Sequence, residues 1–351
     1  MADWALAERV GRWVAGLSAV PATGQDVARL RGLVAAAVKL ADAPSRRVTG
    51  LGEDLAPASA RVVSRGEWIA ANLDSMRFLT DPHAEALLSR ATFPPQASRK
   101  AVGVQVGMIF GYLSTRVLGQ YEVFLPGGQT PGRLTLVGPN LLQIERDLTA
   151  ETDIQASELI LGVVLHELGH RLQFEGVPWL RPHLRSIMDD YLARSQIDPD
   201  RIRKGLAGLR GKIISGQIDL RDLMEAFLTP EQTSRLEQAQ SVMSLLEGHG
   251  NVVMDWGAEV LADEGVDPAR VRQALNRRRN SAGGPAKLLA KALGMGMKAE
   301  QYAVGESFIG DVASRHGRDM FNRVWDDPDN IPTTDELTDP DAWAARITRA
   351  A

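Results

Sequence analysis

The amino-acid sequence predicts a mainly α-helical protein with one small β-hairpin or sheet. Segments rich in Ala and Leu fill most of the 351 residues, and both residue types favour helix. The only convincing strands are two short β-branched and aromatic runs on either side of a loop rich in Gly and Pro. A chain of this length can bury a core without disulfide or metal cross-links, as one large domain or two modest ones.

The composition excludes several classes of protein. Hydrophobic residues make up 44% of the chain and charged residues 24%, which indicates a folded protein rather than a disordered one. Lys and Arg total 40 against 44 Asp and Glu, so the formal charge of -4 gives no overall attraction to nucleic acid or to an anionic membrane. Cysteine is absent. Disulfides and thiolate zinc sites are therefore excluded, and a transition-metal site would need His, Asp or Glu ligands.

The N-terminal segment is predicted to be an amphipathic helix, because Trp4, Trp13 and Leu17 recur at roughly helical spacing. It lacks the basic and continuously apolar regions of a secretory signal. The one membrane-like run, residues 101–119, is interrupted by Gln, Ser, Thr and Arg and falls short of the ~20 apolar residues that a span needs. We therefore expect a cytoplasmic protein without a membrane partner, and the lack of cysteine fits that compartment.

The distribution of residue types along the chain predicts two parts. Residues 1–98 alternate helical patterns with turns marked by Pro and Gly, and we expect an N-terminal helical region packed on the remainder, residues 99–351. Every fourth residue from Gly103 to Gly111 is glycine, a pattern that favours close packing against a second helix. From residue 157 onward nearly everything is helical, and several helices are predicted at about 178–240.

Two strands are predicted to form a hairpin in the middle of the chain. Tyr121–Leu125 and Arg133–Val137 carry the β-branched and aromatic residues, and the loop between them is rich in Gly and Pro. The sequence that follows Val137 begins with Gly-Pro-Asn, which is typical turn chemistry and ends the second strand.

The motif that indicates chemistry is His-Glu-Leu-Gly-His at residues 166–170. Residues four apart lie about 40° apart around a helix, with Cβ atoms ~5–6 Å from each other, so His166 and His170 can reach one metal ion. Glu167 lies beside them, where its carboxylate can take a proton from a water bound to the metal. The apolar helical run before the motif is typical of a buried active-site helix.

A zinc ion needs a third protein ligand, and the segment around Glu247 is the most suggestive candidate. Glu247 follows an apolar helical run, so its carboxylate is expected to be buried and to need a partner. His249 competes for the same role, although in a regular helix it would point about 200° away. Asn251, one turn after Glu247, could hydrogen-bond a ligating histidine. The neighbouring glycines weaken the helix prediction, so His249 stays an alternative third ligand.

The sequence resembles a bacterial family of zincin-like metallopeptidases whose members are labelled as hydrolases associated with deazaflavin coenzyme biosynthesis. The resemblance covers roughly residues 100–345. The matching stretches are Gly111–Ser114, Arg116–Tyr121, Val137–Asn140, His166–His170, Gln173–Leu180, Leu245–His249, Gln301–Tyr302, Gly305 and Phe308.

This resemblance implies a zincin-like catalytic domain over residues 99–351, with a helical insertion at about 178–240 and the HExxH motif on the active-site helix. It implies that His166, His170 and Glu247 bind zinc and that Glu167 is the catalytic base. The sequence departs from the family at Asn251, where relatives generally carry Asp. The coenzyme label comes from genomic association and implies no chemistry.

The function that we expect is zinc-dependent hydrolysis of a peptide or protein substrate. The metal would polarise the scissile carbonyl, and Glu167 would accept the water proton and pass it to the leaving amine. The strand Arg133–Val137 is expected to be an edge strand that pairs with an extended substrate. Candidates to stabilise the oxyanion are His249, Tyr302, His183 and Tyr191.

Two other functions are weighed against hydrolysis. The chain could be a non-proteolytic zincin-like scaffold, used as a regulatory or binding protein with its metal kept for stability. Against this, an intact Glu167 favours an enzyme, because a structural site would not need it. The segment Arg270–Lys298 carries eight basic and no acidic residues. A solvated basic surface explains it better than a nucleic-acid site, and no nucleic-acid partner is expected.

Overall fold

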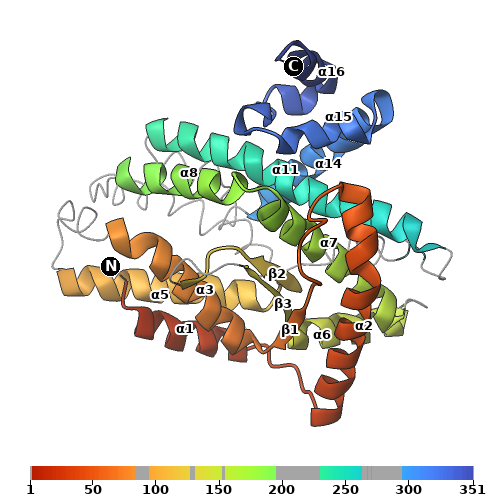
Figure 1. Ribbon diagram of the computed structural model, residues 1–351. Helices are drawn as coiled ribbons and strands as arrows, with labels where there is room; N and C mark the ends of the chain where they lie inside the picture. The colour runs from red at the N-terminus through yellow and green to blue at the C-terminus, as the bar shows by residue number, and fades with distance from the viewer. Residues whose placement is uncertain are drawn as a thin grey trace. The chain divides into compact units, whose positions relative to one another are not determined.

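Figure 1 shows the computed structural model, which describes residues 2–83, 95–126, 131–151, 155–194, 230–262, 267, 270 and 295–350. Helices dominate and three short strands form one small sheet, as the sequence predicts. Two compact units are distinguished, Met1–Gly176 with Val253–Leu275, and Val177–Val252 with Asn276–Ala351. None of the described helices combines the length and the apolar character that crossing a membrane requires. The division predicted at residue 98 stays a prediction.

Among its described residues, the first unit is built from six whole helices together with the end of α11 (Pro230–Val260) from Val253 on. The six are α1 (Trp4–Gly16), α2 (Gly24–Thr49), α3 (Arg65–Thr80), α5 (Pro95–Ser114), α6 (Gly138–Glu151) and α7 (Ala156–Gly176), and a 3-10 turn, η1 (Asp81–His83), follows α3. Capping residues define several of their ends. Thr23 and Asp26 form a reciprocal capping box at the start of α2, as Ser64 and Glu67 do at the start of α3. Gly50 ends α2 in the left-handed conformation, with φ of 66°.

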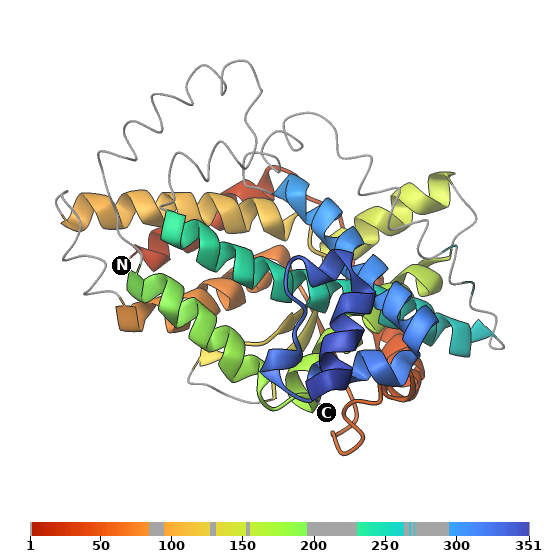
Figure 2. The same ribbon diagram turned by 90° about the horizontal axis from the view of Figure 1, so that it is seen from above.

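The glycines of α5 allow α1 to approach closely, as their spacing predicts. A Cβ atom at Gly103 would lie 2.6 Å from the carbonyl oxygen of Asp3, and one at Gly111 would lie 2.6 Å from that of Gly11. Figures 1 and 2 both show the two helices side by side. The absence of side chains at these positions therefore sets the separation of α1 and α5.

The sheet has the strand order β1-β3-β2. Its strands are β1 (Ala60–Val63), β2 (Gly119–Glu122) and β3 (Arg133–Val137). β2 and β3 are antiparallel, which confirms the hairpin, although β2 begins and ends earlier than expected. β1 pairs in parallel with β3 along the whole of its length.

The position of β3 corrects one prediction. Arg133–Val137 is the central strand and is hydrogen-bonded on both sides, so it cannot be the edge strand that pairs with a substrate. The error follows from missing β1, a four-residue strand whose Ala-Arg-Val-Val sequence carries almost no alternation.

The core of the first unit lies between α2, α6, α7 and the sheet. The buried residues of this core are mostly aliphatic. They surround α7 with apolar side chains on most of its circumference. The cluster includes Leu30, Val34, Val38, Leu136, Leu141, Val164, Leu165, Leu168, Met254 and Ala258. A helix that is apolar on nearly every face must be buried, and this explains why the sequence before the motif is a continuous hydrophobic run.

The second unit contains α8 (Leu180–Arg194), the greater part of α11 (Pro230–Val260), α14 (Met295–His316), α15 (Arg318–Asn322) and α16 (Pro340–Ala350). Short 3-10 turns, η4 (Arg323–Trp325), η5 (Pro328–Asn330) and η6 (Glu336–Thr338), lie between α15 and α16. Figure 2 shows α14, α15 and α16 packed together, and Phe308 and Trp343 meet edge to face in this cluster. Helices α11 and α14 pack closely at Gly248 and Gly305, where an added Cβ atom would meet the backbone of the other helix.

Candidate metal centre

Helix α7 carries the two histidines and the glutamate of the motif. Every residue from Leu159 to Leu165 is buried, whereas His166 and His170 are half-buried. Glu167 is buried, with 7% of its surface exposed. Apolar packing therefore fixes the helix before the motif, and the two histidines lie where the helix becomes partly accessible to solvent.

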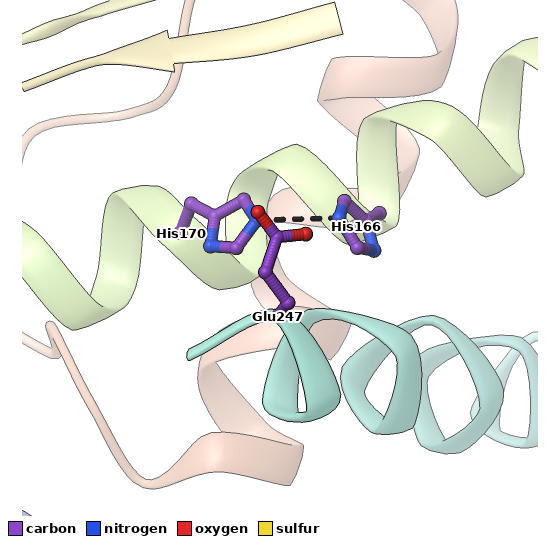
Figure 3. Close-up of side chains that lie close together, drawn as sticks. All are labelled: His166, His170 and Glu247. Carbon is purple, nitrogen blue, oxygen red and sulfur yellow. Dashed lines mark hydrogen bonds between the residues drawn. The ribbon is translucent and has the colours of Figure 1, made fainter. Parts of the chain in front are cut away.

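The two imidazoles face the same point. Their Nε2 atoms lie 3.2 Å apart, and the rings are nearly perpendicular with centroids 4.8 Å apart. The dashed line in Figure 3 marks this contact. Two imidazole nitrogens converging in this way could share a cation in place of the proton between them, which is the arrangement that the four-residue spacing predicts.

Gln173 fixes the tautomer of His170. The Nδ1 of His170 donates a hydrogen bond to Oε1 of Gln173 at 2.9 Å, because an amide oxygen can only accept. In the neutral imidazole, a proton on Nδ1 leaves the lone pair of Nε2 for a metal. Gln173 is fully buried and lies one turn after His170. The sequence reasoning missed this role, which the spacing of three residues on a predicted helix could have suggested.

Glu247 joins the histidine pair. One ligand atom from each of His166, His170 and Glu247 lies within 4.8 Å of the others, and all three residues are half-buried. Figure 3 shows the Glu247 carboxylate next to the two rings. The position follows from helix geometry, because Met254 and Ala258 lie on the same face of α11 as Glu247, to within about 20°. Both of these residues pack in the core that contains α7.

These three side chains fit a zinc ion. Two imidazole nitrogens and one carboxylate form a donor set that zinc enzymes use, and three protein ligands leave a coordination position for water or substrate. Partial burial shields the donors without closing the centre. The chain has no cysteine that could offer a competing thiolate.

His249 does not join this group. Its side chain is fully buried, and its ring packs against Phe321 and Trp325 with centroids 5.5 and 5.0 Å away. The 200° separation from Glu247 on a regular helix explains the different environment. Among the described residues, the structure thus groups Glu247 and not His249 with the histidine pair.

Asn251 has a different partner from the one that the sequence suggested. Its Nδ2 donates to Oε2 of Glu306 at 3.0 Å, whereas the Nδ1 of His170 donates its hydrogen bond to Gln173. Asn251 is buried, and its amide donates a hydrogen bond to the Glu306 carboxylate. An aspartate at position 251 would instead place a second negative charge next to Glu306, and the two carboxylates would repel each other.

The remaining oxyanion candidates lie on α8 and α14. His183 meets Trp179 edge to face at 5.7 Å, and burial lowers the pKa of its imidazole against an opposing effect of Asp329. The side chains of Tyr191 and Tyr302 lie outside the described part of the structure, as does nearly all of the basic segment Arg270–Lys298.

A buried ion network holds α7 just beyond the motif. Arg171 contacts Asp42 of α2 at 3.3 Å and Glu175 at 3.4 Å, and it donates to the carbonyl oxygen of Ala56 at 2.6 Å. Tyr121 of β2 donates to Glu175. Because these partners come from three different segments, the end of α7 that bears His170 is fixed on several sides.

Glu167 lies against the sheet rather than in open solvent. The space directly outside Gly119 of β2 is filled by the Glu167 side chain. The strand beside the motif is therefore β2, at one end of the sheet, and not the central β3.

Comparisons with known proteins agree with this arrangement. A solved structure from Chloroflexus aurantiacus, described provisionally as a hydrolase with a novel fold, is similar with a TM-score of 0.70 and 27% identity over 99% of each chain. A search of the curated proteins finds no match. The family model for zincin-like metallopeptidases matches residues 2–344, nearly the whole sequence. The chain therefore belongs to the zincin-like metallopeptidase family.

Proposed function

We propose that this protein is a zinc-dependent hydrolase that cleaves peptide bonds. The observation that carries the proposal is the cluster of His166, His170 and Glu247, with the buried Glu167 between the two histidines in sequence. The family of the chain and the description of the Chloroflexus protein support hydrolysis.

His166, His170 and Glu247 would hold the metal. When bound there, zinc supplies Lewis acidity, which polarises a carbonyl group and lowers the pKa of a water molecule to near 7. Gln173 accepts the Nδ1–H of His170 and so orients the ring with Nε2 toward the proposed metal. The carboxylate of Glu167 accepts the proton of the attacking water and returns it to the leaving nitrogen, so that the amine departs uncharged.

An extended peptide is the substrate class that the surroundings favour. β2 lies beside Glu167 and pairs with β3 on one side, and no other described strand pairs with its opposite side. A peptide lying along that side could form main-chain hydrogen bonds while its scissile bond faces Glu167.

The test compares wild-type protein with two substitutions in the motif. Glu167→Gln keeps the shape of the side chain but removes the base, so we expect zinc to stay bound and cleavage of a peptide library to fall at least 100-fold. His166→Ala is expected to lose zinc and cleavage together. Metal is measured by mass spectrometry after dialysis.

The matched control is Glu259→Gln, the same substitution at an exposed position of α11. It should retain full zinc content and full cleavage. Undiminished cleavage by Glu167→Gln would contradict the assignment of the base. Zinc-loaded wild-type protein that cleaves no peptide would favour the alternative, a non-proteolytic zincin-like scaffold.

A further inference from the structure

Gly119 is the first residue of β2 and pairs with Leu136 of the central strand. Glycine weakens a strand because it loses more backbone entropy than other residues and packs no side chain. The backbone does not require glycine here. Among the described residues, the glycines with positive φ are Gly50, Gly52 and Gly317, so Gly119 has a conformation open to any residue.

The reason for glycine is the space next to it. A Cβ atom at position 119 would lie 2.8 Å from Cγ, 2.9 Å from Oε1 and 3.1 Å from Cδ of Glu167, and these are its three nearest atoms. Contacts this short are repulsive, so a methyl group would displace the glutamate side chain. Glu167 is therefore the residue that an added side chain at position 119 would displace first.

We propose that Gly119 is a positioning residue for Glu167. By having no side chain, it leaves room for the carboxylate to lie against β2 and next to the metal-binding histidines. Helix α7, which bears Glu167, cannot move away from β2, because it is fixed by Val164 and Leu168 in the core and by the ion network around Arg171. The catalytic consequence of this inference rests on the proposed function, whereas the steric relation between the two residues does not.

The first test is a double-mutant cycle read by thermal unfolding, which needs neither metal nor substrate. Gly119→Ala should lower the unfolding midpoint by about 3 °C in the wild-type background, as overpacking does. In a Glu167→Ala background, the clashing atoms are gone, and the same substitution should lower the midpoint by less than about 1 °C. If Gly119→Ala alone fails to fold, recovery of folding in the double variant supports the proposal.

Gly257→Ala is the matched control. Its Cβ would lie 2.7 Å from Cδ2 of Leu165, also a side chain of α7, so the clash is of similar size. Glu167→Ala should not relieve it. Equal losses for Gly119→Ala in both backgrounds, or failure of both Gly119 variants to fold, would overturn the proposal.

The second test reads the metal centre and the reaction. Gly119→Ala should keep the zinc content and zinc affinity of the wild type, because the three atoms nearest to the new methyl group all belong to Glu167 and not to a ligand. With a cleavable peptide, kcat should fall at least tenfold with little change in KM, since a displaced base affects the chemical step. Loss of zinc, or an unchanged kcat, would overturn the positioning role. If wild-type protein cleaves nothing, the proposed function fails, while the unfolding cycle still decides the relation between Gly119 and Glu167.

Discussion

The hydrogen bond between His170 and Gln173 gives a residue-level prediction. Replacing Gln173 with Leu removes the acceptor that holds the His170 proton on Nδ1. Loss of such a bond typically weakens metal binding 10- to 100-fold, and we expect zinc affinity to fall by about that amount. Gln173→Glu, which keeps an acceptor, should retain more of it. Competition with a chromogenic chelator measures both, with Gln155→Leu, at the exposed residue just before α7, as control. Equal affinities for wild type and Gln173→Leu would refute this role.

At the same scale, the sequence predicts local relations well and distant ones poorly. His166 and His170 are found from spacing because one helical turn brings them together whatever the rest of the fold does. Glu247 can be suggested only from its apolar context and the family resemblance, because its approach to the histidines depends on tertiary packing. Asn251 shows the limit. Its position in sequence suits a hydrogen bond to a ligand, yet its partner Glu306 comes from another helix that the spacing does not reveal.

At the level of elements, the crossing of α1 and α5 depends on glycine. A Cβ atom at Gly107 would lie 2.9 Å from Cβ of Val10 and 3.0 Å from Cα of Ala7. Alanine is the better helix former by about 1 kcal/mol, but overpacking costs about 1–3 kcal/mol, so Gly107→Ala should destabilise the protein. Gly32→Ala in α2, where nothing lies within 4 Å, should be neutral or stabilising. Urea unfolding monitored by circular dichroism compares the two, and a stable Gly107→Ala would contradict the packing argument.

The strands and helices also show which elements a sequence pattern can predict and which it cannot. The hairpin of β2 and β3 is predictable because β-branched residues flank a loop of Gly and Pro. β1 is not, since four residues with one buried side chain give no alternation to detect. Missing that strand reversed the interpretation of β3, because the place of a strand in a sheet is defined by its neighbours. The glycine stripe of α5 was interpretable because close approach needs small residues, whichever helix supplies the partner.

For the whole molecule, the class of the fold follows from composition and periodicity, while the site follows from how distant segments meet. A chain dominated by Ala- and Leu-rich segments, with few β-branched runs, is mainly helical. The same statistics do not specify that α11 brings Glu247 toward α7, because that depends on the packing of Met254 and Ala258 two and three turns further along the helix. A metal held by both helices would therefore connect segments that are far apart in sequence.

Such a connection predicts that zinc stabilises the folded chain. A ligand that binds only the native state adds about 4 kcal/mol at a free concentration a thousand times its Kd, which should raise the unfolding midpoint by several degrees. EDTA should reverse the shift. Glu247→Ala should reduce it strongly because one of the three proposed ligands is lost, whereas Glu167→Gln should retain it because we propose Glu167 as the base and not as a ligand. Differential scanning calorimetry with and without zinc measures all of these shifts. An equal shift in Glu247→Ala would show that zinc binds elsewhere, and loss of the shift in Glu167→Gln would place that carboxylate among the ligands.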